Sequence, residues 1–212
     1  MNSFDTGLYF ITDSTGLSEE TFLRRTEAAL QGGVTLLQIR EKDKTTREYL
    51  HLAQKVHVLA QRYGVPLIID DRLDVAMAIN AEGVHLGQSD MPIHMARSLF
   101  GGDKIIGATA KTVPQAREAC EQGADYLGVG AIYPTTTKVK TVLTSTDTLR
   151  DICHAVPIPV NAIGGLNRDN IDVLQGIPIA GICVVSAIMK AADPRQAAID
   201  LRARAKELGI IV

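Results

Sequence analysis

The chain has 212 residues, of which 46% are hydrophobic and 22% are charged; this balance indicates a globular protein with a large core and excludes a disordered one. The formal net charge of -2, without any run of basic residues, argues against nucleic acid or an anionic membrane as a partner. The three cysteines include no C-x-x-C pair, so we expect neither a disulfide framework nor a zinc site.

The first seven residues lack a basic segment followed by an apolar stretch, and no apolar run reaches the ~18 residues that a membrane span needs. We therefore expect a cytoplasmic protein with a single domain, residues 1–212. The sequence leaves the oligomeric state open.

Short apolar runs typical of strands alternate with amphipathic helical segments along the chain. Ser18 with two acidic residues behind it, and Thr45 with Glu48 in capping-box spacing, predict helix starts. Asp193, followed by a proline, predicts the start of the last helix. The expected strands are 7–11, 35–39, 65–69, 83–86, 105–108, 126–129, 159–163 and 181–185, and the expected helices begin near 18, 45, 74, 92, 112, 148, 167 and 193.

Eight such units predict an α/β fold, a single-domain (β/α)8 TIM barrel. An open, doubly wound sheet also alternates strands and helices, but it usually carries G-x-G-x-x-G after its first strand. That motif is absent here, which favours the closed barrel.

Residues able to hold phosphate, metal or a polar ring gather where the predicted strands end, while the opposite ends carry packing and turn residues. This one-sided distribution is typical of a barrel with a single active face. The polar segments are 38–42, 70–71, 88–90, Thr109, 135–138, 164–165 and 185–186.

Three of these segments suggest charge chemistry. Asp70, Asp71 and Asp90 would repel one another at a shared rim, unless a hard dication such as Mg²⁺ lies between them; a solvated turn with a helix cap is the alternative. Arg40 and Lys42 leave their strand on one face and suit a phosphate, or else pair with a neighbouring acid.

The remaining segments suggest anion binding. Lys138, among the threonines of the long polar stretch 130–146, forms either an anion clamp or part of an ordinary polar loop. Gly165 and Ser186 follow strands seven and eight, where barrel enzymes often hold phosphate, although simple turn glycines are possible. His85 lies inside a strand, where a core histidine is the favoured interpretation.

Taken together, the motifs closely resemble those of thiamine phosphate synthases, over about residues 9–192. The matching segments, in order, are Gln38-Ile39-Arg40-Glu41-Lys42, Asp70-Asp71, Gly87-Gln88-Ser89-Asp90, Tyr133-Pro134-Thr135-Thr136-Thr137-Lys138, Ile163-Gly164-Gly165 and Val185-Ser186.

The resemblance implies a barrel enzyme that joins a hydroxymethylpyrimidine diphosphate to a thiazole phosphate and releases pyrophosphate, with Mg²⁺ as cofactor. Catalysis would fall to Arg40, Lys42 and Lys138, and the metal would be held by Asp71 and Asp90. The implied pyrimidine diphosphate site is Gln38, Ile39, Arg40, Glu41, Lys42, Asp70, Thr109 and Lys138. The implied thiazole phosphate site is Thr135, Thr136, Thr137, Gly165, Val185 and Ser186.

The sequence also departs from the family pattern. Asp70 stands where the family commonly has Asn, Thr109 replaces a usual serine, and Lys111 stands where a His is frequent. A related branch contains thiazole tautomerases, whose catalytic histidine falls near Lys111, and a non-catalytic barrel that binds thiamine precursors is a third possibility. The acids and lysines of the motifs favour the synthase.

Overall fold

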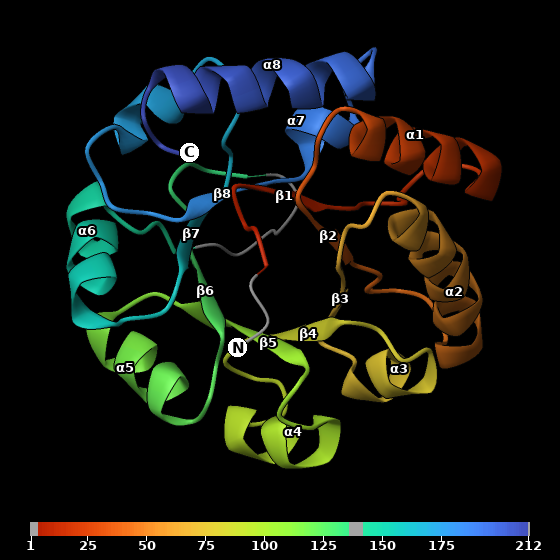
Figure 1. The fold of residues 1–212 in the computed structure, drawn as a ribbon, viewed down its shortest axis with the longest axis horizontal. Coiled ribbons are helices and arrows are strands. Elements are labelled where there is room, and N and C mark those ends of the chain that lie inside the picture. The colour runs from red at the N-terminus through yellow and green to blue at the C-terminus, as the bar shows by residue number, and fades with distance from the viewer. Residues whose placement is uncertain (1–3, 136–141, 212) are drawn as a thin grey trace.

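Eight parallel strands close into a barrel that is surrounded by helices (Figure 1). The computed structural model describes residues 4–135 and 142–211. Each strand pairs with the next along the chain, and β1 closes the ring against β8, with Tyr9 opposite Cys183. The predicted (β/α)8 fold is confirmed. The strands are β1 (Leu8–Ile11), β2 (Leu36–Ile39), β3 (Leu67–Asp70), β4 (Gly83–Leu86), β5 (Ile105–Ala110), β6 (Tyr126–Gly130), β7 (Val160–Ile163) and β8 (Gly181–Val184).

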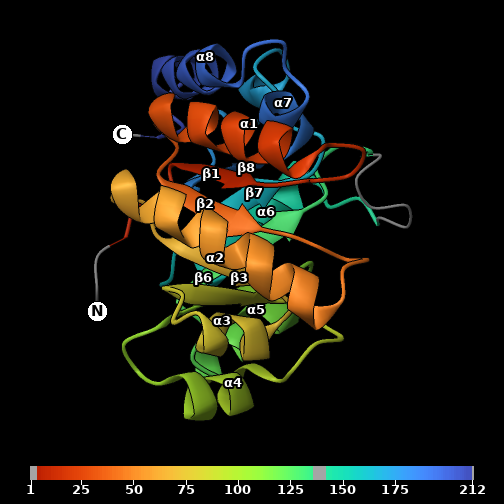
Figure 2. The same ribbon diagram turned by 90° about the vertical axis from the view of Figure 1, so that its right-hand side faces the viewer.

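Helices follow each other around the outside of the barrel, and the side view shows α8, α1, α2 and α3 as neighbours along one flank (Figure 2). Within residues 4–135 and 142–211, no helix combines the length and apolar character that crossing a membrane requires. The helices are α1 (Glu19–Gln31), α2 (Thr46–Arg62), α3 (Leu73–Ala78), α4 (Ile93–Phe100), α5 (Val113–Glu121), α6 (Thr146–Ala155), the 3-10 helix η1 (Ile171–Leu174), α7 (Ser186–Met189) and α8 (Pro194–Glu207).

The predicted helix caps are present. Ser18 accepts a hydrogen bond from the Thr21 N–H at the start of α1. Thr45 and Glu48 form the reciprocal capping box of α2. Asp193 caps α8 by accepting from the first N–H groups of that helix. These side chains satisfy donors that have no partner inside the helix, and so they fix where each helix begins.

The segment 167–174 differs from the expected helix, because only Ile171–Leu174 is helical and it is a 3-10 turn. Asparagine side chains hold the preceding residues in turns instead: Asn170 accepts from the Asn167 N–H, and Asn167 accepts from the Asp169 N–H. Such local bonds compete with the helix ladder.

Alternation along the strands separates two packing layers. Leu8 and Phe10 of β1 belong to the large cluster beneath the helices, whereas Tyr9 and Ile11 belong to a small cluster inside the barrel. Phe4 packs edge-on against Tyr126 and joins this inner cluster. Because side chains alternate with a period of two, each strand offers every second residue to the barrel interior.

Candidate active site

A cavity of about 620 Å³ lies at the C-terminal ends of the strands. This is the face on which barrel enzymes carry their chemistry. Thr136, Thr137 and Lys138 lie outside the described residues. The other predicted site residues that line the cavity are Gln38, Arg40, Lys42, Asp70, Asp71, Asp90, Thr109, Thr135, Gly165, Val185 and Ser186.

Two residues of the predicted pyrimidine site lie elsewhere. The Ile39 side chain is fully buried in the layer between barrel and helices. Glu41 accepts a hydrogen bond from the Ser14 hydroxyl at 2.7 Å and lies 3.7 Å from the Lys44 ammonium. Side chains alternate along an extended chain, so Gln38 and Arg40 point into the barrel and the residues after them point outward. Neither the Ile39 nor the Glu41 side chain therefore lines the cavity. The side chains of Ile39 and Glu41 thus lie outside the cavity, and a role of either residue in the pyrimidine site stays a prediction from the sequence.

Cations and carboxylates are interleaved where the ends of β2 and β3 line the cavity. The Lys42 ammonium lies 3.0 Å from the Asp70 carboxylate and also contacts Asp71. The Arg40 guanidinium lies 3.6 Å from Asp70. Burial by itself would lower the pKa of Lys42, but the charges of Asp70 and Asp71 outweigh burial and raise this pKa above its ordinary value. Lys42 is therefore charged at neutral pH.

Asp70 is the most perturbed carboxyl group of the site. Burial, followed by the charge of Asp71, raises its pKa from 3.8 to about 6, although Lys42 and Arg40 act in the opposite direction. Only 8% of Asp70 is exposed, so its charge is poorly solvated. The buried Tyr49 hydroxyl donates to the backbone oxygen of Ile39 at 2.8 Å and of Asp70 at 3.4 Å, which ties β2 to β3 beneath this charge.

Asp71 and Asp90 face one another at the rim. Asp71 adopts the left-handed conformation, with φ of 60°, a conformation that Asp tolerates better than most residues. Burial and the neighbouring Asp71 raise the pKa of Asp90, while the Gly87 N–H, which donates to it at 2.7 Å, lowers that pKa.

Two carboxylates that repel one another supply hard oxygen ligands, which is the donor set that Mg²⁺ prefers. Among the described residues, no group of three or more His, Cys, Asp or Glu side chains forms a potential metal site. A metal held by Asp71 and Asp90 would therefore need further ligands from water or substrate, as is common for Mg²⁺.

The opposite wall of the cavity is built from backbone. Gly164 and Gly165, directly after β7, have φ of 105° and 64°. A Cβ at Gly165 would lie 2.7 Å from the Tyr133 Cβ, so the side-chain-free backbone brings the 133–135 segment close to β7. Val185 and Ser186, at the start of α7, also line the cavity. Backbone N–H groups at such a helix start can donate to an anion.

Several residues that line the cavity are not among the site residues predicted from the sequence. His85 was interpreted as a core histidine, but it lines the cavity and lies 2.9 Å from the Thr109 hydroxyl through its Nε2 atom. Tyr9 and Lys111 also line it. The available signal was alternation in β4, where His85 lies between the outward-facing Val84 and Leu86.

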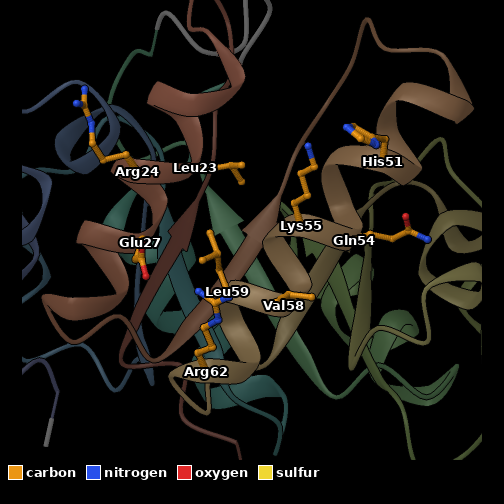
Figure 3. Close-up of a pocket in the computed structure, with 9 residues that line it drawn as sticks. All are labelled: Leu23, Arg24, Glu27, His51, Gln54, Lys55, Val58, Leu59 and Arg62. Carbon is orange, nitrogen blue, oxygen red and sulfur yellow. The ribbon is translucent and has the colours of Figure 1, made fainter.

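A second hollow, of about 500 Å³, lies on the outside of the barrel between α1 and α2 (Figure 3). Figure 3 shows Leu23 and Glu27 on α1 and Lys55 and Leu59 on α2 among the residues that line this hollow. It contains none of the predicted site residues, and its Lys55 is paired with Glu19. The strand-end cavity is therefore the candidate active site.

A family model described as thiamine monophosphate synthase matches residues 8–188, which is most of the chain. The chain belongs to this family. It is 50% identical over 193 residues to thiamine-phosphate synthase 2 of Streptococcus pneumoniae, covering 91% of this chain and 92% of that one. It is 47% identical over 201 residues to a thiamine-phosphate synthase of Methanobrevibacter smithii, covering 95% and 96% of the two chains.

Solved structures agree with this family membership. A thiamine phosphate pyrophosphorylase from Pyrococcus furiosus superposes with a TM-score of 0.87 at 39% identity, covering 96% of each chain. The resemblance noted in the sequence to thiamine phosphate synthases is thus confirmed. A structure titled KGPDC from Streptococcus mutans has a TM-score of 0.71 at 13% identity, which shows only that the barrel fold is shared.

Proposed function

We propose that this member of the thiamine monophosphate synthase family is a Mg²⁺-dependent transferase. It condenses 4-amino-2-methyl-5-(diphosphooxymethyl)pyrimidine with a thiazole phosphate and yields thiamine phosphate and pyrophosphate. When the thiazole is carboxylated, its carboxylate leaves as CO2, which is a third product. The observation that carries the proposal is the cavity at the strand ends, where cationic and acidic side chains of the matched motifs converge.

The fixed cations of β2 suit the diphosphate. Arg40 and Lys42 project from the same face of the strand end into the cavity. A guanidinium can grip phosphate oxygens through two donors, and an ammonium adds a compact charge. Their present partners, Asp70 and Asp71, hold both cations in place before a substrate arrives. Lys138, outside the described residues, is proposed from the sequence motif as a third cation.

Asp71 and Asp90 are the residues that would hold Mg²⁺. When bound, the ion would neutralise the negative charge that develops on the departing pyrophosphate. The mutual repulsion of the two carboxylates makes this position favourable for a dication.

The proposed displacement is dissociative. The C–O bond between the pyrimidine methylene and the diphosphate breaks first, and the bonding electrons leave with pyrophosphate. The thiazole nitrogen then donates its lone pair to the resulting methylene cation. No side chain needs to remove a proton in these two steps, so the protein acts by stabilising charge and by orienting the two rings.

The thiazole phosphate is proposed to bind at the opposite wall. Gly165, Val185 and Ser186 offer backbone and hydroxyl donors there, and Thr135 lines the same cavity. Thr136 and Thr137 belong to this proposed set from the sequence alone. The two phosphorylated groups would then approach from different sides of the barrel mouth.

The test is to incubate the protein with both phosphorylated heterocycles, with and without Mg²⁺, and to measure pyrophosphate and thiamine phosphate. We expect equal amounts of both products, only when the pair and Mg²⁺ are present. Reactions with either heterocycle alone serve as controls. Conversion of the thiazole alone, without pyrophosphate, would identify a tautomerase, whereas binding without turnover would identify a non-catalytic barrel.

A further inference from the structure

A chain of polar side chains crosses the barrel interior beneath the cavity. The Gln38 amide nitrogen donates to the Tyr9 hydroxyl at 2.6 Å, and this hydroxyl lies 2.7 Å from that of Tyr126. The Tyr126 hydroxyl lies 3.1 Å from Nδ1 of His85, whose Nε2 lies 2.9 Å from the Thr109 hydroxyl. The chain therefore connects β2 to β5 through residues of β1, β6 and β4.

Proton counting gives the chain one direction. The Tyr9 hydroxyl accepts from Gln38, so its own proton can only go to Tyr126 among the described partners. Tyr126, already an acceptor, then donates its single proton to Nδ1 of His85. The opposite direction would leave the proton of the almost fully buried Tyr9 without an acceptor. Burial also raises the pKa of both phenols well above the ordinary value, which keeps both protons in place.

The two ends of the chain are residues of the proposed pyrimidine site. With Nδ1 acting as an acceptor, neutral His85 carries its proton on Nε2 and donates it to the Thr109 hydroxyl. The hydroxyl proton of Thr109 is then available to the cavity, which Thr109 lines. At the other end of the chain, the hydrogen bond to Tyr9 fixes the rotation of the Gln38 amide. Gln38 also lines the cavity, so this bond sets how its amide is presented there.

Tyr126 is the central member and the one that does not line the cavity. It is fully buried, and the barrel is shaped around its ring: a Cβ at Gly107, on the neighbouring strand, would lie 2.1 Å from the ring. Phe4 and Tyr9 pack edge-on against the same ring. Its hydroxyl is therefore held in place by packing, independently of any ligand.

We propose that Tyr126 is a positioning residue that presets both ends of the pyrimidine site. Its hydroxyl fixes the Nε2–H tautomer of His85, and through it the donor direction of Thr109, while it also anchors Tyr9 beneath Gln38. This inference rests on the proposed function for its substrate, but not for the hydrogen-bond chain itself. The ligand class is an aromatic nitrogen heterocycle that needs a fixed donor on one side and a fixed amide on the other.

The first test needs neither substrate nor variant of Tyr126. In protein labelled with ¹⁵N-histidine, the five histidines are resolved by NMR, and loss of one signal in His85→Gln assigns His85. We expect a protonated Nε2 and an unprotonated Nδ1 in the wild-type protein. A proton on Nδ1 would overturn the proposal.

The second test is Tyr126→Phe, which keeps the ring and removes the hydroxyl. We expect the His85 tautomers to mix, and the KM for the pyrimidine diphosphate to rise by about fivefold, since one hydrogen bond is lost. The KM for the thiazole phosphate should stay within about twofold. Thr26→Val is the matched control, because the buried Thr26 hydroxyl donates to the Phe22 oxygen within α1, and Thr26 is not among the described residues that line the cavity.

The outcomes separate the two proposals. If the wild-type protein does not form thiamine phosphate but shows the expected tautomer, the proposed function fails and the hydrogen-bond chain stands. If the wild-type protein is active and Tyr126→Phe matches it in both tautomer and KM, the positioning role fails. Equal KM increases for both substrates would likewise contradict it, because they would indicate a general loss of structure.

Discussion

The Lys42 ammonium lies 3.0 Å from the Asp70 carboxylate and at the same time contacts Asp71, so one cation pairs with two neighbouring acids of the cavity. The three residues come from the ends of β2 and β3, which pair side by side. Substrate phosphate would have to share or replace these contacts. Lys42 is therefore both a structural partner of the acids and the proposed ligand of the diphosphate.

Lys42→Met is expected to lower kcat/KM for the condensation by at least ~100-fold, because a fixed charge opposite the departing pyrophosphate is lost. The measurement is steady-state release of pyrophosphate at saturating Mg²⁺. Lys55→Met is the matched control, since Lys55 also pairs with an acid but lies on the outer groove between α1 and α2 (Figure 3). Equal activity of the two variants would contradict the role of Lys42.

Asp70 should make stability depend on pH. The pKa of its carboxyl group is about 6 in the folded chain, against an ordinary value of 3.8. Between these two pH values the folded state therefore binds more protons than the unfolded state. Stability contributed by this group is therefore lost as the pH rises from about 4 to 6. We expect Asp70→Asn to lack this loss. Between pH 4 and pH 7 its free energy of unfolding should therefore rise by roughly 2–3 kcal/mol relative to that of the wild type.

Urea unfolding of both proteins at pH 4 and pH 7, in EDTA, measures this difference. The two proteins share all other titrating groups, so the difference between their pH slopes isolates Asp70. Parallel slopes would show that Asp70 ionises normally in the folded protein.

Asp90→Asn should have opposite effects with and without metal. Without Mg²⁺ the substitution removes the repulsion between Asp71 and Asp90, and its amide oxygen can still accept from the Gly87 N–H; we expect a higher unfolding temperature. With Mg²⁺ and pyrophosphate, the wild-type protein should gain stability through binding, and the variant should gain much less. Thermal unfolding with each addition measures both effects.

The matched control is Asp169→Asn, because Asp169 is 89% exposed at its side chain and does not line the cavity. It should respond to Mg²⁺ and pyrophosphate as the wild type does. If Mg²⁺ and pyrophosphate raise the unfolding temperature of Asp90→Asn as much as that of the wild type, Asp90 is not part of the proposed metal site.

The barrel could be predicted from sequence because its signals are local. Each strand is a short apolar run, and residues such as Ser18 and Thr45 mark helix starts within three positions of their partners. The expected helix at 167–174 was wrong in extent. The side chains of Asn167 and Asn170 accept hydrogen bonds from nearby backbone N–H groups, and composition alone does not show whether these bonds or the helical ones prevail.

The candidate site was predictable where strand order decides it. The ends of β3 and β4 are neighbours, and the structure places Asp71 beside Asp90 as expected. Ile39 and Glu41 were included because the motif was taken as a whole, although alternation sends them away from the cavity. For His85, alternation in β4 could have predicted a side chain that points into the barrel, but not its partners. Thr109 and Tyr126 lie 24 and 41 residues away along the chain, so no local pattern connects them to His85.

Gly165 tests the opposite wall of the cavity. Gly165→Ala places a Cβ about 2.7 Å from Tyr133 and 2.8 Å from the Pro134 oxygen, at a φ of 64°. Gly176→Ala is the matched control, because its φ is 76° but nothing lies within 4 Å of the new Cβ. Both variants should lose about 1 kcal/mol through the left-handed conformation, and Gly165→Ala should lose roughly 1–3 kcal/mol more through overpacking.

The two variants should also differ in kinetics. Overpacking at Gly165 pushes the 133–135 segment away from β7, so we expect the KM for thiazole phosphate to rise about tenfold, an effect typical of a misplaced binding group. Gly176→Ala should keep the wild-type KM, since it lies beyond η1 and does not line the cavity. If Gly165→Ala instead raises only the KM for the pyrimidine diphosphate, the thiazole phosphate does not bind at the ends of β7 and β8. The proposed assignment of the two substrates to the two walls of the cavity is then reversed.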